Sequence, residues 1–233
     1  MSPVTSVVLV HGAWADGSAW SKIIPLLESK GLNVACVQLP LSSIDDDVAA
    51  ATRIINAQSG SVLLAGHSYG GSVITQAGIN PKVAGLLYVA AFAPDEGETL
   101  SGLASRYPPT ETFGELNVIE DGYILLTKKG VYEYFAQDLT DAEKAVIFAT
   151  QGATNFTAIL PVTIRTAAWR SKPSWFIVAE NDKAVHPLQE KETAERMKAE
   201  ILVLQTSHVP MLAEPQAVAN FMIKAVDKLN SGK

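Results

Sequence analysis

The segment Ser61-Val62-Leu63-Leu64-Ala65-Gly66-His67-Ser68-Tyr69-Gly70-Gly71 decides the fold of this chain. An apolar run leads directly into G-x-S-x-G, the pattern of a sharp turn from a buried strand into a helix. Such a turn strains the backbone of Ser68, and side chains at Gly66 or Gly70 would collide inside it. Ser68 then stands at a helix N-terminus, where backbone amides and the helix dipole favour a developing negative charge. The motif therefore predicts that Ser68 is a nucleophile.

Short apolar, β-branched runs alternate along the chain with longer amphipathic stretches. Nearly continuous apolar runs are typical of strands covered on both faces, as in a parallel sheet. The expected strands are 6–10, 34–39, 61–65, 84–91, 175–179 and 201–204. The expected helices are 19–30, 45–58, 70–78, 188–199 and 215–229. This alternation predicts an α/β protein with a doubly wound, mainly parallel six-stranded sheet and helices on both faces.

One long interval, residues 98–162, breaks the alternation of strands and helices. It contains Pro108-Pro109, several glycines and scattered aromatic residues, and Thr140-Asp141-Ala142-Glu143 is a capping box that opens a helix. The interval is too long for a plain connection and too apolar for a linker. We therefore expect residues 1–97 and 163–233 to form the core, and residues 98–162 to form an inserted cap.

The loop after the last expected strand contains His208. Ligands of an open α/β sheet bind outside the carboxyl ends of its strands, so this loop is where a general base for Ser68 is expected. His208 would take the proton of the serine hydroxyl. Of the other histidines, His11 and His67 adjoin glycine motifs and are expected to have structural roles. His186 precedes a proline and is expected at the surface.

An acid that orients the base should lie between Ser68 and His208 in a chain with the order Ser, Asp, His. Asp182 follows the fifth expected strand and has this position. Its carboxylate would accept the other ring N–H of His208 and stabilise the imidazolium. Glu180, still within the strand, and Asp95, after the fourth strand, are the alternatives.

The first expected strand ends in a His-Gly-Ala-Trp sequence. An oxyanion hole requires two backbone N–H groups aimed at the oxygen that becomes negative. We expect one from Tyr69, directly after the nucleophile, and the other from Ala13. Gly12 would allow the backbone to approach closely. Trp14 and Trp20 are either pocket walls or core residues.

Composition excludes several classes of protein. The hydrophobic fraction of 48% and the charged fraction of 18% are those of an ordinary globular protein. A formal net charge of −6 argues against nucleic acid or an anionic membrane as a partner. No apolar run approaches the ~20 residues that span a bilayer, and the N-terminus lacks the positive residues of a signal peptide. A soluble cytoplasmic protein is therefore expected.

Nothing in the sequence indicates a metal or a cofactor. Histidines are few and scattered, the chain has one cysteine, and no H-x-x-x-H pair occurs. Neither G-x-G-x-x-G nor a Walker pattern follows a strand, so neither a dinucleotide nor ATP is expected. The single Cys36 lies in an apolar run and is expected to be a buried, inert thiol. The oligomeric state is not set by the sequence.

Together, four motifs resemble those of the α/β-hydrolase superfamily: His11 to Trp14, Gly66 to Gly71, the loop from Asp182 to Pro187, and Ser207-His208. The nearest resemblance is to compact members grouped with plant methyl-ester esterases and hydroxynitrile lyases. It extends over about residues 4–97 and 163–230 and is weak in the cap. The resemblance implies the α/β-hydrolase fold, a mixed helical cap and a mechanism without a cofactor.

Two positions separate esterases from lyases within this group. The lyases tend to carry threonine where this chain has Gly12, and lysine, which stabilises the leaving cyanide, where it has Val209. The predicted activity is therefore hydrolysis of a small to medium apolar carboxylic ester by Ser68, His208 and Asp182, through an acyl-enzyme. Lyase or C–C hydrolase chemistry on the same triad, and a hydrolase-shaped ligand receptor, are the alternatives. The cap offers aromatic residues for an apolar pocket: Phe113, Tyr132, Tyr134, Phe135, Phe148 and Phe156.

Overall fold

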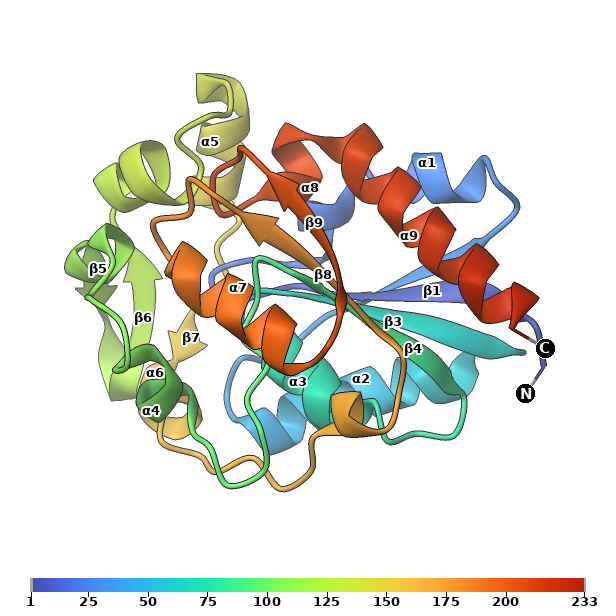
Figure 1. Cartoon of the computed structure of the whole chain (residues 1–233). Helices are drawn as coiled ribbons and strands as arrows, with labels where there is room; N and C mark the ends of the chain where they lie inside the picture. Colours follow the sequence, from blue (N-terminus) through green and yellow to red (C-terminus); the bar gives the residue numbers. More distant parts are fainter. Residues whose placement is uncertain (1, 233) are drawn as a thin grey trace.

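A six-stranded parallel sheet forms the centre of the computed structural model, which describes residues 2–232 (Figure 1). The strand order is β2-β1-β3-β4-β8-β9, and every neighbouring pair is parallel. The strands are β1 (Val4–Val10), β2 (Asn33–Val37), β3 (Ser61–His67), β4 (Val83–Val89), β8 (Ser174–Ala179) and β9 (Glu200–Leu204). The chain begins with β1, next to one edge, adds the edge strand β2, and then returns past β1 to build the rest of the sheet to the other edge. The predicted doubly wound fold is therefore confirmed.

Burial differs between the central strands and the edge strands. All residues of β3 and β4 are buried, whereas the edge strands β2 and β9 keep partly exposed residues. Cys36 lies in β2 and is half-buried, so the prediction of a buried thiol is wrong. An edge strand has a neighbour on one side alone, which leaves this side chain partly open to solvent. Burial still raises the pKa of the Cys36 thiol to about 11, and a neutral thiol is a poor nucleophile.

Helices cover both faces of the sheet. Figure 1 shows α1 (Ile24–Glu28), α8 (Pro210–Ala213) and α9 (Pro215–Ser231) on one face, and α2 (Ile44–Ala57) and α3 (Gly70–Ala77) on the other. A further helix, α7 (Pro187–Arg196), packs against β8. Four of the five expected helices agree with these bounds to within a few residues.

The helix expected over residues 19–30 is divided into two shorter elements. Gly17–Trp20 is a 3-10 helix, and α1 begins at Ile24. Pro25 lies in the first turn of α1, where its missing N–H leaves no bond unmade. A helix running through from residue 19 would place that proline in its interior, where the ring clashes with the preceding turn.

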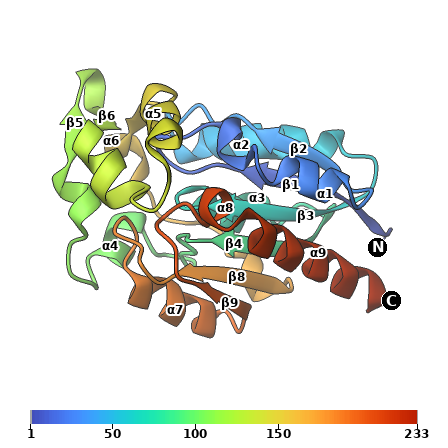
Figure 2. The ribbon, with the colours of Figure 1, turned by 90° about the horizontal axis from the view of Figure 1, so that it is seen from above.

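Residues 100–159, between β4 and β8, form a separate layer beyond the carboxyl ends of the strands, opposite the two termini (Figure 2). It contains an antiparallel three-stranded sheet in the order β5-β6-β7, which the sequence did not predict. The predicted capping box is confirmed, because Thr140 and Glu143 cap each other's backbone at the start of α5. The elements are α4 (Leu100–Ala104), β5 (Leu116–Val118), β6 (Tyr123–Leu126), a π-helix (Gly130–Phe135), α5 (Asp141–Ala149), β7 (Thr154–Asn155) and α6 (Phe156–Ile159).

Among residues 2–232, no helix combines the length and the apolar character needed to cross a bilayer.

The tight junction between β1 and α3 yields a test of the fold. A Cβ atom at Gly70 would lie 2.5 Å from the carbonyl oxygen of His11 and 2.7 Å from that of Val10. Because backbone atoms cannot move aside cheaply, Gly70→Ala should lower the free energy of unfolding by about 1–3 kcal/mol. Gly114→Ala is the control, since its Cβ would meet no atom within 4 Å. Urea denaturation measures both, and equal midpoints would contradict the predicted clash.

Candidate active site

Ser68 occupies the turn between β3 and α3 with a strained backbone. Its φ of 54° lies in the left-handed region, as the sequence motif predicted. The Ser68 amide donates to the carbonyl of Val89 at 3.1 Å, and its own carbonyl accepts from the amides of Gly71 and Phe92 at 3.0 and 3.2 Å. These bonds tie the turn to β4 and to the loop that follows it, so the surrounding structure holds the strained conformation. A Cβ at Gly66 would lie 2.6 Å from the Gly70 carbonyl oxygen, which explains why glycine is required there.

The backbone after β1 passes directly over Ser68. A Cβ atom at Gly12 would lie 2.6 Å from the Cβ of Ser68, so a side chain here is excluded. The next residue, Ala13, lines the same cavity as Ser68 and Tyr69. Within residues 2–232, the amides of Ala13 and Tyr69 donate to no carbonyl or side chain. Both predicted oxyanion donors therefore have an uncommitted N–H beside the serine.

His208 and Asp182 form a buried pair at the carboxyl ends of β9 and β8. Nδ1 of His208 lies 2.5 Å from Oδ2 of Asp182. The other oxygen of Asp182, Oδ1, accepts from the amides of Ala184 and Val185 at 2.6 and 3.0 Å. Nε2 of His208 has no hydrogen-bond partner in the described part of the chain. That nitrogen is the one that a base uses to take a proton.

The alternative acids have other partners. Asp95 forms a two-pronged ion pair with Arg170, at 2.6 and 2.8 Å. Glu180 accepts a hydrogen bond from the exposed side chain of Gln205. Asp182 is therefore the candidate that the structure places against the imidazole, while its role as the acid remains a prediction.

His11 and His67 are hydrogen-bonded to backbone groups of the site. Nε2 of His11 accepts the Leu39 amide at 3.0 Å, so its Nδ1–H donates to the Gly12 carbonyl at 2.9 Å. Nε2–H of His67 donates to the carbonyl of His208 at 2.7 Å. Burial lowers the pKa of His11, and it lowers that of His67 far below the usual value, so both rings are neutral. Each holds a backbone segment of the site in place, in agreement with the structural roles expected for them.

His186 is a helix cap rather than a free surface residue. Its Nδ1 accepts the amide of Leu188 at 3.2 Å, which caps the N-terminus of α7. The ring is half-buried and stacks on Tyr107, with the ring centroids 5.6 Å apart. The expectation of a surface position is therefore correct only in part.

Trp14 and Trp20 have different surroundings. Trp14 has a φ of 58°, and its amide and indole N–H donate to Thr154 Oγ1 and the Ile124 carbonyl, each at 3.1 Å. It lies between the cavity of Ser68 and a second cavity of about 220 Å³. Trp20 is fully buried. Trp14 is thus a pocket wall, held by the cap, and Trp20 is a core residue.

The cavity at Ser68 is small and apolar. It measures about 70 Å³, and Phe113 and Phe156 of the cap contribute to its walls. A more open hollow of about 310 Å³ shares five of these wall residues: Phe92, Ser101, Ala104, Phe113 and Ala184. Of the other cap aromatics, Phe135 lies against the ring of His208, at 4.9 Å between centroids. Phe148 is 39% exposed, and lysines lie over the rings of Tyr132 and Tyr134.

The end of the π-helix contacts both loops of the His208–Asp182 pair. Besides the packing of Phe135 on His208, the Asp138 carboxylate accepts the Ser207 amide at 2.6 Å. Nε2 of Gln137 donates to the carbonyl of Asn181 at 2.8 Å. Sequence reasoning missed these contacts because π-helices, which are frequent at functional sites, have no simple periodic signature. In residues 2–232, no group of His, Cys, Asp and Glu side chains is arranged to hold a metal ion.

The model of the alpha/beta hydrolase family matches residues 7–221. The chain belongs to this family.

Individual relatives of this alpha/beta hydrolase are distant. Methylesterase 1 of Arabidopsis thaliana is 24% identical over 253 residues, with 95% of each chain covered. The alpha-hydroxynitrile lyase of the same plant is 33% identical over 115 residues, 43% of this chain and 45% of the lyase. A crystal structure of a pyrethroid hydrolase matches with a TM-score of 0.84 at 21% identity, covering 96% of this chain and 98% of that one. The predicted resemblance to esterases and lyases of this superfamily is confirmed.

A buried carboxylate that the sequence did not indicate supports the turn of the alpha/beta hydrolase. The Tyr69 hydroxyl donates to Oδ2 of Asp47 at 2.5 Å, and the Leu41 amide donates to Oδ1 at 2.8 Å. Burial raises the pKa of Asp47 to about 6, although both hydrogen bonds oppose this. Its ionised form is therefore disfavoured in the folded protein, so its contribution to stability falls as the pH rises from about 4 to about 6. The hydrogen bond to Asp47 fixes the side chain of Tyr69, the residue whose amide is a predicted oxyanion donor.

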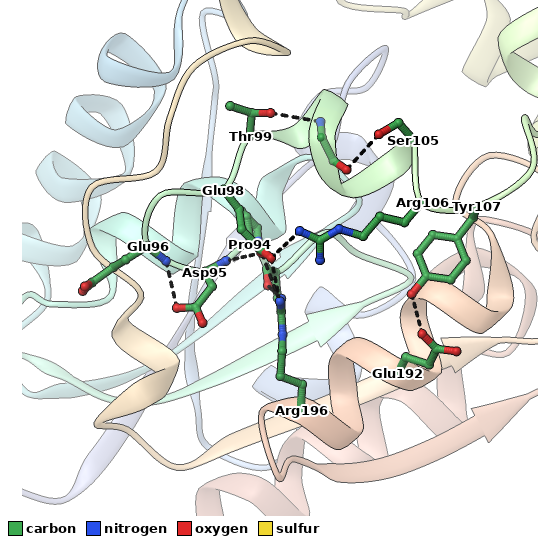
Figure 3. Close-up of polar contacts among 12 residues, drawn as sticks. Pro94, Asp95, Glu96, Glu98, Thr99, Ser105, Arg106, Tyr107, Glu192 and Arg196 are labelled. Atoms are coloured by element: carbon green, nitrogen blue, oxygen red, sulfur yellow. Dashed lines mark hydrogen bonds and ion pairs between the residues drawn. The ribbon is translucent and has the colours of Figure 1, made fainter.

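A charged network lies beside the more open hollow, of about 310 Å³, of the alpha/beta hydrolase (Figure 3). Glu98 accepts from Arg106 at 2.8 Å, from Arg196 of α7 at 2.9 Å and from the Asp95 amide at 2.7 Å. Burial raises the pKa of Glu98, but these hydrogen bonds outweigh burial, and the pKa is lowered. The Tyr107 hydroxyl, which borders the hollow, donates to Glu192 of α7 at 2.7 Å. Helix α7 therefore holds the segment around α4 in place.

The link between Tyr69 and Asp47 predicts a pH-dependent cost. At pH 8 Asp47 is ionised and needs the Tyr69 hydroxyl, so Tyr69→Phe should lower the free energy of unfolding by about 2 kcal/mol. At pH 4.5 Asp47 is neutral, given its pKa of about 6, and the loss should be less than half as large. Urea denaturation at both pH values gives the difference. Tyr123→Phe, at a half-buried site in β6, is the control, and an equal loss at both pH values would contradict the charge-assisted bond.

Proposed function

We propose that this alpha/beta hydrolase is a carboxylesterase that cleaves small to medium apolar esters through an acyl-enzyme. Ser68 is the nucleophile, His208 is the general base and Asp182 orients and stabilises its imidazolium. One observation carries the proposal: a buried His–Asp pair with a free Nε2 lies at the same edge of the sheet as a strained serine. Relatives that are named methylesterases support ester hydrolysis as the reaction.

The chemical steps follow from the positions of these groups. Nε2 of His208 takes the hydroxyl proton of Ser68 while the serine oxygen attacks the ester carbonyl. The amides of Ala13 and Tyr69 donate to the resulting oxyanion, which binds them more strongly than the neutral carbonyl does. His208 then gives its proton to the departing alcohol, and the acyl group remains on Ser68. A water molecule deprotonated by His208 attacks this acyl-enzyme and releases the acid.

The dimensions of the site support a modest apolar substrate. The cavity beside Ser68, at about 70 Å³, accommodates a short group, and the adjoining hollow of about 310 Å³ accommodates the larger part of the ester. The walls contributed by Phe113 and Phe156 favour apolar groups. A neutral ester loses little on leaving water for such a cavity, whereas a charged substrate would lose much more.

The surroundings of Ser68 do not favour lyase chemistry, although an alpha-hydroxynitrile lyase is among the relatives. A departing cyanide is negative and requires a nearby cation or strong donor. Among the described residues, no charged side chain lines the Ser68 cavity. Val209 follows His208, and Nζ of Lys183, the nearest cation in sequence to Asp182, lies over the ring of Tyr134 at 5.4 Å.

The first test removes the nucleophile. Ser68→Ala should reduce kcat on an activated p-nitrophenyl ester at least ~10³-fold, because the covalent step is lost, while leaving the melting temperature close to that of the wild type. A serine-directed phosphonate should label Ser68 alone, as identified by peptide mass spectrometry. Ser29→Ala, an exposed serine at the end of α1, is the control and should behave as wild type. Near-normal turnover by Ser68→Ala, or a label on another residue, would show that Ser68 is not the nucleophile.

The second test separates esterase from lyase. Both reactions can use Ser68, His208 and Asp182, so the leaving group must be varied instead of the triad. We expect hydrolysis of p-nitrophenyl esters and negligible cleavage of mandelonitrile, since the cavity offers cyanide no cation. Both rates are measured at one enzyme concentration, after subtraction of spontaneous cyanohydrin decay. Cyanide release that depends on the enzyme and exceeds ester turnover would reverse the assignment.

A further inference from the structure

Glu190 is a buried carboxyl group in α7 that the steps above do not use. Its side chain is fully buried, and Oε2 accepts the amide of Ala179, the last residue of β8, at 2.9 Å. The other oxygen, Oε1, receives no hydrogen bond from any donor in residues 2–232. The described chain also contains no ion pair that involves Glu190. An ionised carboxylate in this position would be a buried charge without a counter-ion.

Glu190 and Asp182 are held on the same residue: the Ala179 amide donates to Glu190, and the Ala179 carbonyl accepts the Asp182 amide at 3.2 Å. This places the two carboxyl groups within hydrogen-bonding reach of each other. The remaining buried residues of α7 are uncharged: Gln189, Thr193 and Ala194. The buried residues of β8 are apolar as well. Two carboxylates in contact, without a cation, cannot both be ionised, so one of them must hold a proton.

The hydrogen bonds already made decide which carboxyl is protonated. Asp182 accepts three, from the amides of Ala184 and Val185 and from Nδ1–H of His208, and all three favour its ionised form. Glu190 accepts one bond alone. Burial first, and then the charge of Asp182, raises the pKa of Glu190 well above its usual value.

We infer that Glu190 is a positioning residue that holds a proton and donates a hydrogen bond to the carboxylate of Asp182. This bond fills the fourth of the roughly four lone-pair sites of a carboxylate, three of which are occupied by the amides and by His208. All four sites of the Asp182 carboxylate are then occupied, which fixes its orientation toward His208. A role of this bond in catalysis rests on the proposed function. The presence of one proton shared between Glu190 and Asp182 does not.

Glutamine is the variant that tests the proton. A neutral glutamic acid and a glutamine have the same shape, with one oxygen that accepts from Ala179 and one group that donates to Asp182. Glu190→Gln should therefore keep kcat on an activated ester within about threefold of wild type. Glu190→Leu removes the donor at similar volume and should lower kcat at least about tenfold, the range seen when a supporting hydrogen bond is lost.

Two measurements need no substrate. The infrared spectrum of wild type at pH 8, where Asp47 is ionised, should contain the carbonyl stretch of a neutral carboxylic acid, and Glu190→Gln should lack it. Because folding at neutral pH requires Glu190 to take up a proton, the melting temperature of Glu190→Gln relative to wild type should rise as the pH increases from 5 through neutral pH. Glu195→Gln, an exposed position of the same helix, should retain the infrared band and show no such trend.

The outcomes separate cleanly. A neutral-acid band that persists in Glu190→Gln, or a flat difference in melting temperature with pH, would overturn the shared proton. Loss of kcat in Glu190→Gln as large as in Glu190→Leu would overturn the positioning role. If the protein had no esterase activity, the infrared and melting data would still decide the protonation of Glu190, so the two proposals fail separately. Both physical tests use wild type, Glu190→Gln and Glu195→Gln, and they stand even if Glu190→Leu does not fold.

Discussion

The close approach of the chain after β1 to the turn after β3 is the constraint on which the site depends. Neighbouring strands bring Val10 and Gly66 into register, and Gly70 packs its α-carbon against the carbonyl groups at the end of β1. At the same level, Gly12 meets the side chain of Ser68 with no room for a Cβ. The close packing at these glycines therefore serves both stability and the site. It lets β1 and α3 pack together, and it places the Ala13 amide beside Ser68.

The cap and α7 form contacts around this closely packed centre. The segment after the π-helix holds the loops that carry Asp182 and His208, through Gln137 and Asp138. Helix α7 contacts the cap on its outer side, through Glu192 and Arg196. The residues after the π-helix thus hold the loops of the His208–Asp182 pair, while α7 holds the cap that contains the π-helix.

Local patterns predicted the sheet, four of the five helices and the positions of Ser68, His208 and Asp182 in their loops, because each is encoded by neighbouring residues. The turn requires glycines beside the serine, and parallel strands must deliver their loops to one edge. Contacts of buried carboxyls were not predictable in this way. Asp47 and Glu190 lie on amphipathic helices, and only the packing of distant segments decides that they meet Tyr69 and Asp182. The cap strands, of two to four residues, are too short to show a period.

The absence of charge around Ser68 in the described structure also bears on how a reaction there would end. The apolar walls at Phe113 and Phe156 favour a neutral ester, but the acid that hydrolysis would release ionises at neutral pH. A carboxylate in that cavity would have no cation to pair with, and its transfer from water is costly. If the proposed hydrolysis takes place there, the walls that favour a neutral ester would disfavour the ionised acid, so release of the product would be favoured after each turnover.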